Sequence, residues 1–128
     1  MSLRILIADD HPTVRKSLKQ LLESNMKWHV CGEAANGLEA VQKAALLTPD
    51  VIILDARMPE MDGFEAASQI SSATPAVPIL MYTSFAVAPG TKVVGVRQII
   101  NKVSPQALLS ALDALQVHSD TDLRTAEA

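Results

Sequence analysis

Aspartate residues follow two short apolar runs of the chain, and they are the first candidates for chemistry. Asp9 and Asp10 come after the run Leu3–Ala8, and Asp55 comes after the run Val51–Leu54. Apolar runs of this length that end in polar residues are typical of buried parallel strands, whose carboxyl ends share one edge of a sheet. If the two strands are neighbours, about 4.8 Å apart, the three carboxylates converge at that edge.

Three carboxylates so close together repel one another, which raises a pKa or recruits a cation. A hard divalent ion such as Mg²⁺ resolves the conflict and leaves positions open for phosphate oxygens. An ionised aspartate beside that ion can attack phosphorus and form an acyl phosphate. Thr83 follows a fourth apolar run and Lys102 a fifth, so a hydroxyl donor and a cation are available for the developing charge. The spacing predicts a phosphoryl-transfer site.

The elements that must position these groups alternate along the chain. Strands are expected at residues 3–8, 28–33, 51–54, 78–82 and 97–100. Between and after them come helical periods, the first entered at Pro12, the second at residues 37–47, the third after Asp62-Gly63 and the last at Ser104-Pro105. This alternation predicts an α/β fold, a doubly wound parallel sheet with helices on both faces.

Each predicted helix carries an apolar face that should lie against the sheet. The expected inward residues are Val14, Leu18, Leu21, Leu22 and Met26; Leu38, Val41 and Ala45; Phe64, Ala67 and Ile70; and Leu108, Leu109, Leu112 and Leu115.

One segment does not fit the helical pattern. Residues 85–96 stand where a fourth helix belongs, but they contain the breaker pair Pro89-Gly90 and several valines, which are poor helix formers. We expect a fourth helix that is short or irregular, with a loop around Pro89.

Composition limits the class of protein. The 128 residues are 48% apolar and 20% charged with a formal net charge of −3, which fits one folded domain and argues against nucleic acid as the main partner. A single cysteine, Cys31, excludes an internal disulfide, and no apolar run approaches the length of a membrane helix. We expect a cytoplasmic domain over residues 1–117 and a polar tail or linker start over residues 118–128.

Four sequence motifs together resemble the receiver domain of two-component response regulators, in the type that usually carries a C-terminal helix-turn-helix. They are Ile5-Leu6-Ile7-Ala8-Asp9-Asp10-His11, Asp55-Ala56-Arg57-Met58-Pro59-Glu60-Met61-Asp62-Gly63, Tyr82-Thr83-Ser84 and the downstream Lys102. The resemblance covers roughly residues 3–117 and implies a flavodoxin-like sheet of five parallel strands.

The resemblance also implies a role for each site residue. Asp55 would be the phosphoacceptor. Asp10 and Asp55 would bind Mg²⁺ directly, Asp9 would act through water, and the backbone carbonyl of Arg57 would be a further ligand.

Two more residues and the partners follow from the same resemblance. Thr83 matches the switch hydroxyl that moves toward the phosphoryl group, and Lys102 matches the lysine that pairs with it. The donor would be a phosphohistidine on a sensor histidine kinase or a phosphotransfer protein. A homodimer is possible, whereas direct nucleic-acid binding by this chain, a membrane partner and turnover of a metabolite are not expected.

Three departures from the family pattern affect the signal readout. Ile99 occupies the position of the switch aromatic, three residues before the lysine. Val103 follows Lys102 where a proline in a cis peptide is frequent, and a trans bond is expected because a cis non-proline bond costs about 3–4 kcal/mol. The stretch from Thr83 to Lys102 is shorter than usual by about one helical turn.

Alternatives remain at three residues. His11 could be taken for a metal ligand or a phosphohistidine, but a residue of the loop leading into the first helix is the simpler interpretation, because no second His or Cys has metal spacing around it. Arg57 could contact phosphate or slow hydrolysis, or be an exposed loop arginine. Phe85 could shield the acyl phosphate from water or pack on the loop.

Alternatives also remain for the whole chain. It could be a receiver-like module that binds partners without phosphorylation, or the receiver fragment of a longer DNA-binding regulator. A phosphatase of the haloacid dehalogenase type is excluded, because Arg57 stands where that mechanism needs a second aspartate.

Overall fold

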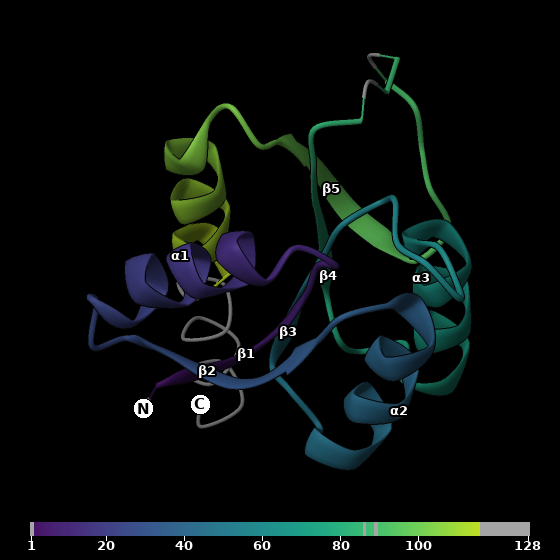
Figure 1. The fold of residues 1–128 in the computed structure, drawn as a ribbon, viewed down its shortest axis with the longest axis horizontal. Coiled ribbons are helices and arrows are strands. Elements are labelled where there is room, and N and C mark those ends of the chain that lie inside the picture. Colours follow the sequence, from purple (N-terminus) through teal and green to yellow (C-terminus); the bar gives the residue numbers. More distant parts are fainter. Residues whose placement is uncertain (1, 86, 89, 116–128) are drawn as a thin grey trace, which may run out of the picture.

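The computed structural model describes residues 2–85, 87–88 and 90–115. One parallel sheet has the strand order β2-β1-β3-β4-β5, with the bounds β1 (Leu3–Ala8), β2 (Trp28–Ala34), β3 (Val51–Leu54), β4 (Ile79–Thr83) and β5 (Val96–Asn101) (Figure 1). Helices α1 (Pro12–Glu23), α2 (Gly37–Leu47) and α3 (Gly63–Ala73) follow β1, β2 and β3, and residues 105–115 are helical after β5. The α/β doubly wound fold is confirmed.

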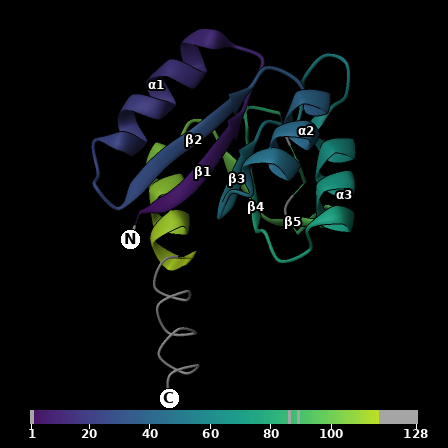
Figure 2. The same cartoon turned by 90° about the horizontal axis from the view of Figure 1, so that it is seen from below.

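Helices cover both faces of the sheet. Figure 2 shows α1 and residues 105–115 on one face and α2 and α3 on the other. Side chains of β1 alternate accordingly: Ile5 and Ile7 join the first apolar cluster, and Leu6 and Ala8 join the second. Because both faces are buried, the strand is apolar from Ile5 to Ala8, and Arg4 lies only at its partly exposed start.

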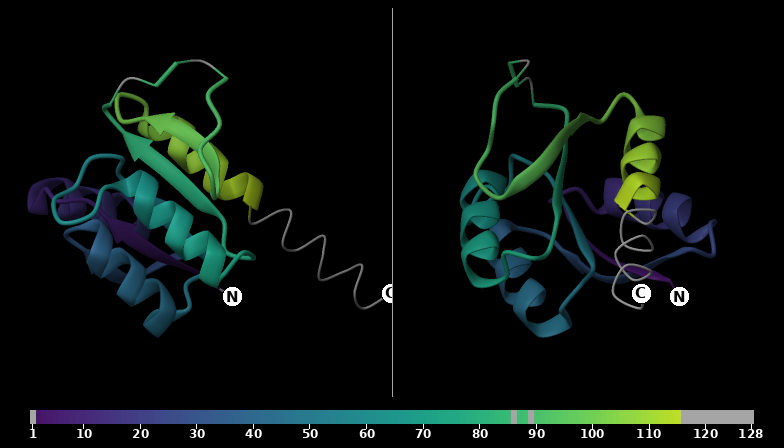
Figure 3. Two further views of the ribbon diagram at one scale, coloured as in Figure 1. Left: turned by 90° about the vertical axis from the view of Figure 1, so that its right-hand side faces the viewer. Right: turned by 180° about the vertical axis from the view of Figure 1, so that it is seen from behind.

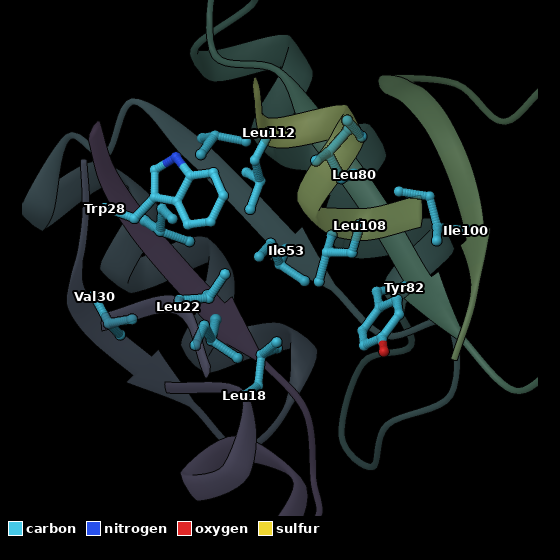
Figure 4. Packing of buried hydrophobic residues seen from close by; sticks show 14 residues of the cluster. Leu18, Leu22, Trp28, Val30, Ile53, Leu80, Tyr82, Ile100, Leu108 and Leu112 are labelled. Atoms are coloured by element: carbon cyan, nitrogen blue, oxygen red, sulfur yellow. The ribbon is translucent and has the colours of Figure 1, made fainter. Parts of the chain in front are cut away.

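The larger cluster lies between the sheet and the pair formed by α1 and residues 105–115 (Figure 4). Trp28, the only tryptophan of the chain, is buried there among aliphatic side chains that include Leu22 and Leu112. Leu108 is also fully buried, and Leu109 and Leu115 pack against the cluster, so the apolar face expected for the last helix is confirmed.

Polar side chains cap the two helices of the opposite face. The Asn36 side chain accepts the backbone N–H of Glu39 at 2.8 Å, and the Asp62 side chain accepts that of Glu65 at 2.9 Å. Each cap satisfies an N–H that the first turn leaves without a partner. The caps fix where α2 and α3 begin, next to the loops that follow β2 and β3.

The inward face of α2 differs from the expected one. Leu38 is 45% exposed and Ala45 is exposed, whereas Gly37, Ala40 and Ala44 are buried. The reason is close packing at the start of the helix, where a Cβ on Gly37 would lie 2.1 Å from the carbonyl oxygen of Met61. Small residues therefore take the inward face, and the larger leucine is displaced outward.

Two of the residues expected inward on α1 are also exposed. The helix ends at Glu23, so Met26 lies in the turn beyond it and is 93% exposed. Leu21 lies at the edge of the buried stripe and is exposed, while Leu18 and Leu22 form the buried face. In α3, Ala67 and Ile70 are buried as expected, and Phe64 is half-buried.

The connection from β4 to β5 departs most from a doubly wound pattern. None of its described residues (84, 85, 87, 88 and 90–95) is helical (Figure 3), and at its end Gly95 lies against Ala67 and Ser71 of α3. Gly90 and Gly95 have φ values of 80° and 83°, a left-handed conformation that does not continue a helix. The expected short or irregular helix is thus a loop in this part of the chain; Pro89 itself lies outside the described residues.

Within the described ranges, no helix has the length and apolar character needed to cross a bilayer. A cytoplasmic location stays a prediction. The expected tail over residues 118–128 lies outside the described residues, so the domain boundary at residue 117 is also still a prediction.

Candidate functional site

Four strands deliver the expected site residues to one edge of the sheet. Strands β1 and β3 are neighbours, as expected, and the Asp55 N–H donates to the Ala8 carbonyl at 2.9 Å. Thr83 is the last residue of β4, and its carbonyl accepts the Lys102 N–H at 3.0 Å. The carboxylates, the hydroxyl and the amine therefore emerge from adjacent carboxyl ends.

Lys102 bridges two buried carboxylates. Its Nζ lies 2.5 Å from Oδ2 of Asp9 and 2.9 Å from Oδ2 of Asp55. Both aspartate side chains are almost fully buried, and the lysine side chain is largely buried. Charged groups removed from water need such partners, so the lysine offsets part of the negative charge that the strand ends concentrate here.

The ion pairing outweighs the cost of burial for both partners. Burial raises the pKa of Asp9, but hydrogen bonds from Lys102 and from the His11 backbone bring that pKa below its usual 3.8. Burial likewise lowers the pKa of Lys102, but hydrogen bonds to Asp9 and Asp55 bring it above its usual 10.5. Asp9 is therefore ionised and Lys102 protonated at neutral pH.

The second carboxylate oxygen of Asp9, Oδ1, lies beside His11. Nδ1 of His11 is 3.1 Å from Oδ1 of Asp9 and 3.0 Å from Oδ1 of Asp10. That Asp10 oxygen is buried, yet it accepts no hydrogen bond from any described residue.

These groups suit a divalent cation. Potential ligand atoms of Asp9, Asp10, His11 and Asp55 all lie within 4.8 Å of one another. An Asp10 oxygen without a hydrogen-bond partner, and two buried carboxylates that share a single lysine, leave negative charge uncompensated. Since carboxylate oxygens are the ligands that Mg²⁺ prefers, the donor set fits that ion.

Thr83 is buried, and its hydroxyl oxygen accepts one hydrogen bond. Oγ1 accepts the backbone N–H of Phe85 at 3.0 Å. A hydroxyl that accepts one bond still has its own hydrogen to donate. Thr83 can therefore serve as a donor without breaking the contact to Phe85.

Arg57 and Phe85 form the rim of the site on the α3 side. The guanidinium carbon of Arg57 lies 4.2 Å from the centroid of the Phe85 ring, a cation–π contact, and the Phe85 ring meets Phe64 edge-on at 6.3 Å. With Met58 and Asp62, these side chains line a cavity of about 360 Å³. Arg57 is exposed, and Phe85 packs on both Arg57 and Phe64, so the arrangement is compatible with either role considered for each residue.

The start of α3 is pressed against the residue that bears the central carboxylate. A Cβ on Gly63 would lie 2.0 Å from the carbonyl oxygen of Asp55, and the Gly63 N–H donates to the Ala56 carbonyl at 2.8 Å. Oδ1 of Asp55 accepts the Ala56 N–H at 2.8 Å. Glycine at this position lets the helix approach and fixes the backbone of the acidic residue.

Arg15 was not anticipated from the sequence. Its Nη1 donates to the backbone carbonyl of Asp9 at 2.6 Å, and its Nε lies 3.3 Å from Oε1 of Glu33. The side chain, only 17% exposed, thus ties the acidic loop to the end of β2. The one available signal was a basic residue one helical turn beyond an acidic strand end.

The departures near β5 are visible in the structure. Ile99 is half-buried and pairs in register with Met81, so an aliphatic side chain stands at the position of the family's aromatic. No cis peptide bond occurs in the described residues, so the expected trans bond between Lys102 and Val103 is confirmed.

Comparisons with known proteins agree on one family. Residues 5–113 match the family model of the response regulator receiver domain. Over 85 residues the chain is 42% identical to the response regulator protein VraR of Staphylococcus aureus (strain Mu3 / ATCC 700698), covering 66% of this chain and 41% of VraR. The chain thus spans about two fifths of the length of the curated relatives it matches.

Solved structures give the same result. The response regulator domain of Thermotoga maritima CheB superposes with a TM-score of 0.80 at 29% identity, covering 91% of this chain and 98% of that one. A chain of the CheX-CheY-BeF3-Mg²⁺ complex from Borrelia burgdorferi superposes with a TM-score of 0.75 at 27% identity, covering 86% and 89%. The chain therefore belongs to the response regulator receiver domains of two-component systems, which are signalling domains rather than turnover enzymes.

Proposed function

We propose that Asp55 accepts a phosphoryl group from a phosphohistidine of a sensor histidine kinase or a phosphotransfer protein, in a Mg²⁺-dependent reaction that switches partner interactions. The observation that carries this proposal is the Lys102 amine held between the buried carboxylates of Asp9 and Asp55. The Asp55 carboxylate can act as a nucleophile, and the neighbouring Lys102 ammonium can neutralise negative charge on the acyl phosphate that forms. Membership in the receiver family supports the same chemistry.

The transfer step forms one bond and breaks one bond. A carboxylate oxygen of Asp55 attacks phosphorus, and the new P–O bond makes an acyl phosphate. The P–N bond to the donor's imidazole breaks, and its electron pair stays on the imidazole nitrogen. Lys102 offsets the negative charge of the phosphoryl oxygens, and Thr83 donates its hydroxyl hydrogen to one of them.

The resemblance to the receiver family supplies the proposed set of metal ligands. Asp10 and Asp55 would hold Mg²⁺ directly with the backbone carbonyl of Arg57, and Asp9 would hold it through water. When bound, the ion neutralises charge on the phosphoryl oxygens and orients them. The buried Asp10 oxygen without a hydrogen-bond partner supports this assignment, as does the presence of BeF3 and Mg²⁺ in the structure of the Borrelia neighbour.

Acetyl phosphate supplies a direct test. Incubation with acetyl phosphate and Mg²⁺ should add the mass of one phosphate to the intact protein, and EDTA should prevent the addition. Asp55→Asn should abolish it, whereas Asp113→Asn, which changes an exposed aspartate paired with Lys27, should not. An unmodified wild-type protein, or equal modification of Asp55→Asn, would contradict the proposal.

A second candidate function has its own support. Ile99 in place of an aromatic, and a β4–β5 connection without helix in its described residues, favour a module that exchanges partners without phosphorylation. Native mass and partner affinity, measured with and without phosphorylation at Asp55, separate the two. A phosphate-dependent change, such as homodimer formation, supports the switch; a phosphorylated protein unchanged in both supports the alternative.

The relatives suggest a wider context. VraR is more than twice as long as the matched region, which supports the alternative that this chain is the receiver part of a longer regulator, one that could bind DNA. In that case DNA binding would lie outside the present sequence, and the full reading frame would identify the output domain.

A further inference from the structure

The two carboxylate oxygens of Asp9 each contact a different side-chain nitrogen. Oδ2 contacts the ammonium of Lys102, whereas Oδ1 contacts the imidazole of His11. The lysine is explained by the phosphoryl chemistry, but the histidine is not. We propose that His11 supplies a nitrogen ligand to the metal ion of this site and thereby strengthens its binding of first-row transition ions such as Co²⁺. This inference rests on the proposed function, because it assumes a divalent ion at the acidic group.

The spacing of His11 and Asp10 suits two ligands of one ion. Neighbouring ligands at right angles, each about 2.1 Å from a small octahedral ion, are separated by about 3 Å. Nδ1 of His11 lies 3.0 Å from Oδ1 of Asp10, which the proposed function makes a direct ligand. The imidazole therefore already stands at a ligand-to-ligand distance from that carboxylate.

Hydrogen bonding accounts for only one of the two contacts of the ring. Nδ1 of His11 is hydrogen-bonded to Oδ1 of Asp9 at 3.1 Å, and the same oxygen accepts the backbone N–H of His11 at 2.9 Å. Oδ1 of Asp10 is buried and accepts no hydrogen bond in the described part of the chain, although the ring nitrogen is close. The ring is 65% exposed, so packing does not hold it against the acids either.

The chemistry of the donor decides which ions benefit. Imidazole is a borderline ligand that suits transition ions, whereas carboxylate, carbonyl and water oxygens suit Mg²⁺. Many sites bind transition ions more tightly than Mg²⁺, so a higher affinity for Co²⁺ alone proves nothing. The informative measurement is how far the Co²⁺ affinity falls when His11 is replaced. The proposal requires that removal of the ring weakens Co²⁺ binding and leaves Mg²⁺ binding unchanged.

Calorimetric titration of metal-free protein with Co²⁺ and with Mg²⁺ tests this. His11→Ala removes the ring, and His11→Asn keeps a polar side chain without the aromatic nitrogen. Both should raise the Kd for Co²⁺ by about tenfold or more, the scale on which changes around metal ligands act. His29→Ala is the matched control, because His29 is similarly exposed and pairs with Glu23 away from the acidic group.

A spectroscopic readout accompanies the titration. The Co²⁺ form of the wild type should give a hyperfine-shifted signal from an exchangeable imidazole proton, and the signal should be missing in both His11 variants. Unfolding followed by Trp28 fluorescence checks that each variant is folded.

Three results would overturn the inference. Unchanged Co²⁺ affinity in His11→Ala would exclude the ring as a ligand, while Mg²⁺-dependent phosphorylation of Asp55 would leave the proposed function intact. Equal weakening of Co²⁺ and Mg²⁺ would mean that the ring only supports the loop. A wild type that binds neither ion would overturn both this inference and the metal dependence of the proposed function.

Discussion

Lys102 contacts residues at the carboxyl ends of three strands. Its amine contacts carboxylates that follow β1 and β3, and its backbone N–H bonds to the end of β4. Removal of one partner from a buried ion pair leaves the others without a counter-charge, which costs more than the pair itself contributes. A neutral side chain here should therefore affect both the chemistry and the metal-free fold.

Lys102→Met should slow phosphorylation of Asp55 by about 10²- to 10³-fold, the usual effect of losing one donor that stabilises developing negative charge. The rate of mass gain in acetyl phosphate and Mg²⁺ measures it. Lys92→Met is the matched control, because Lys92 is an exposed lysine of the β4–β5 connection. A Lys102→Met protein modified at the wild-type rate would remove Lys102 from the mechanism.

The pH dependence of stability should follow Asp9. Its pKa in the folded protein lies below 3.8, because the bonds from Lys102 and His11 outweigh burial. Ionised Asp9 therefore stabilises the fold above pH 3.8, and this contribution disappears as the pH falls further through the folded-state pKa. The raised pKa of Lys102 acts in the opposite direction, with a contribution that is lost as the pH rises above 10.5.

Urea unfolding of the wild type and of Asp9→Asn in EDTA, between pH 6 and pH 3, measures how the contribution of Asp9 to the free energy of unfolding changes on acidification. The advantage of the wild type in free energy of unfolding should narrow below pH 3.8. An advantage that widens on acidification would mean that repulsion among the carboxylates outweighs the pairing with Lys102.

At the scale of elements, the placement of α3 depends on a single missing side chain. In Gly63→Ala the new Cβ would meet the Asp55 carbonyl oxygen at 2.0 Å and the Ala56 Cα at 2.9 Å. Backbone atoms cannot yield cheaply, so the substitution should cost at least about 2 kcal/mol of unfolding free energy and weaken Mg²⁺ binding.

Gly32→Ala provides the comparison for that prediction. Its Cβ would approach only the end of the flexible Leu47 side chain, which can rotate away, so the loss in urea unfolding should be smaller and Mg²⁺ affinity unchanged. Equal effects of the two substitutions would show that the contact between α3 and Asp55 has no special role.

The elements also show what the sequence could and could not predict. β1 and β3 were predicted at their observed bounds, because each is a short apolar run closed by acids, and this pattern also predicted the gathering of Asp9, Asp55 and Lys102. On α2 the prediction was confirmed for Val41, which packs against the core, and was wrong for Leu38 and Ala45, because it weighed apolar size and not the space available beside Gly37. Neither the contact of Arg15 with Asp9 nor the distance from His11 to the acids follows from periodicity, since both depend on the path of one loop.

For the whole molecule, stability and chemistry are located in different places. Leu112 is fully buried in the cluster that contains Trp28, and Trp28 is the first residue of β2, at the end of that strand opposite its carboxyl end. Leu112→Ala should therefore cost about 2–5 kcal/mol of unfolding free energy, measured in urea by Trp28 fluorescence, with the Mg²⁺ affinity of the folded protein unchanged.

An exposed leucine calibrates that measurement. Leu46 is 80% exposed on α2, so Leu46→Ala should change the free energy of unfolding by no more than about 0.5 kcal/mol. A similar loss for the two variants would contradict the assignment of the core.

The bond between Lys102 and Asp9 joins residues 93 positions apart, and this separation matters while the protein is being made. Asp9, Asp10 and Asp55 are synthesised before Lys102, and β5 is the last strand of the sheet in chain order. A nascent or prematurely terminated copy therefore carries the acceptor aspartate without its cation. Under the proposed function, an unfinished chain should accept phosphate more slowly than a finished one, because it lacks the Lys102 amine.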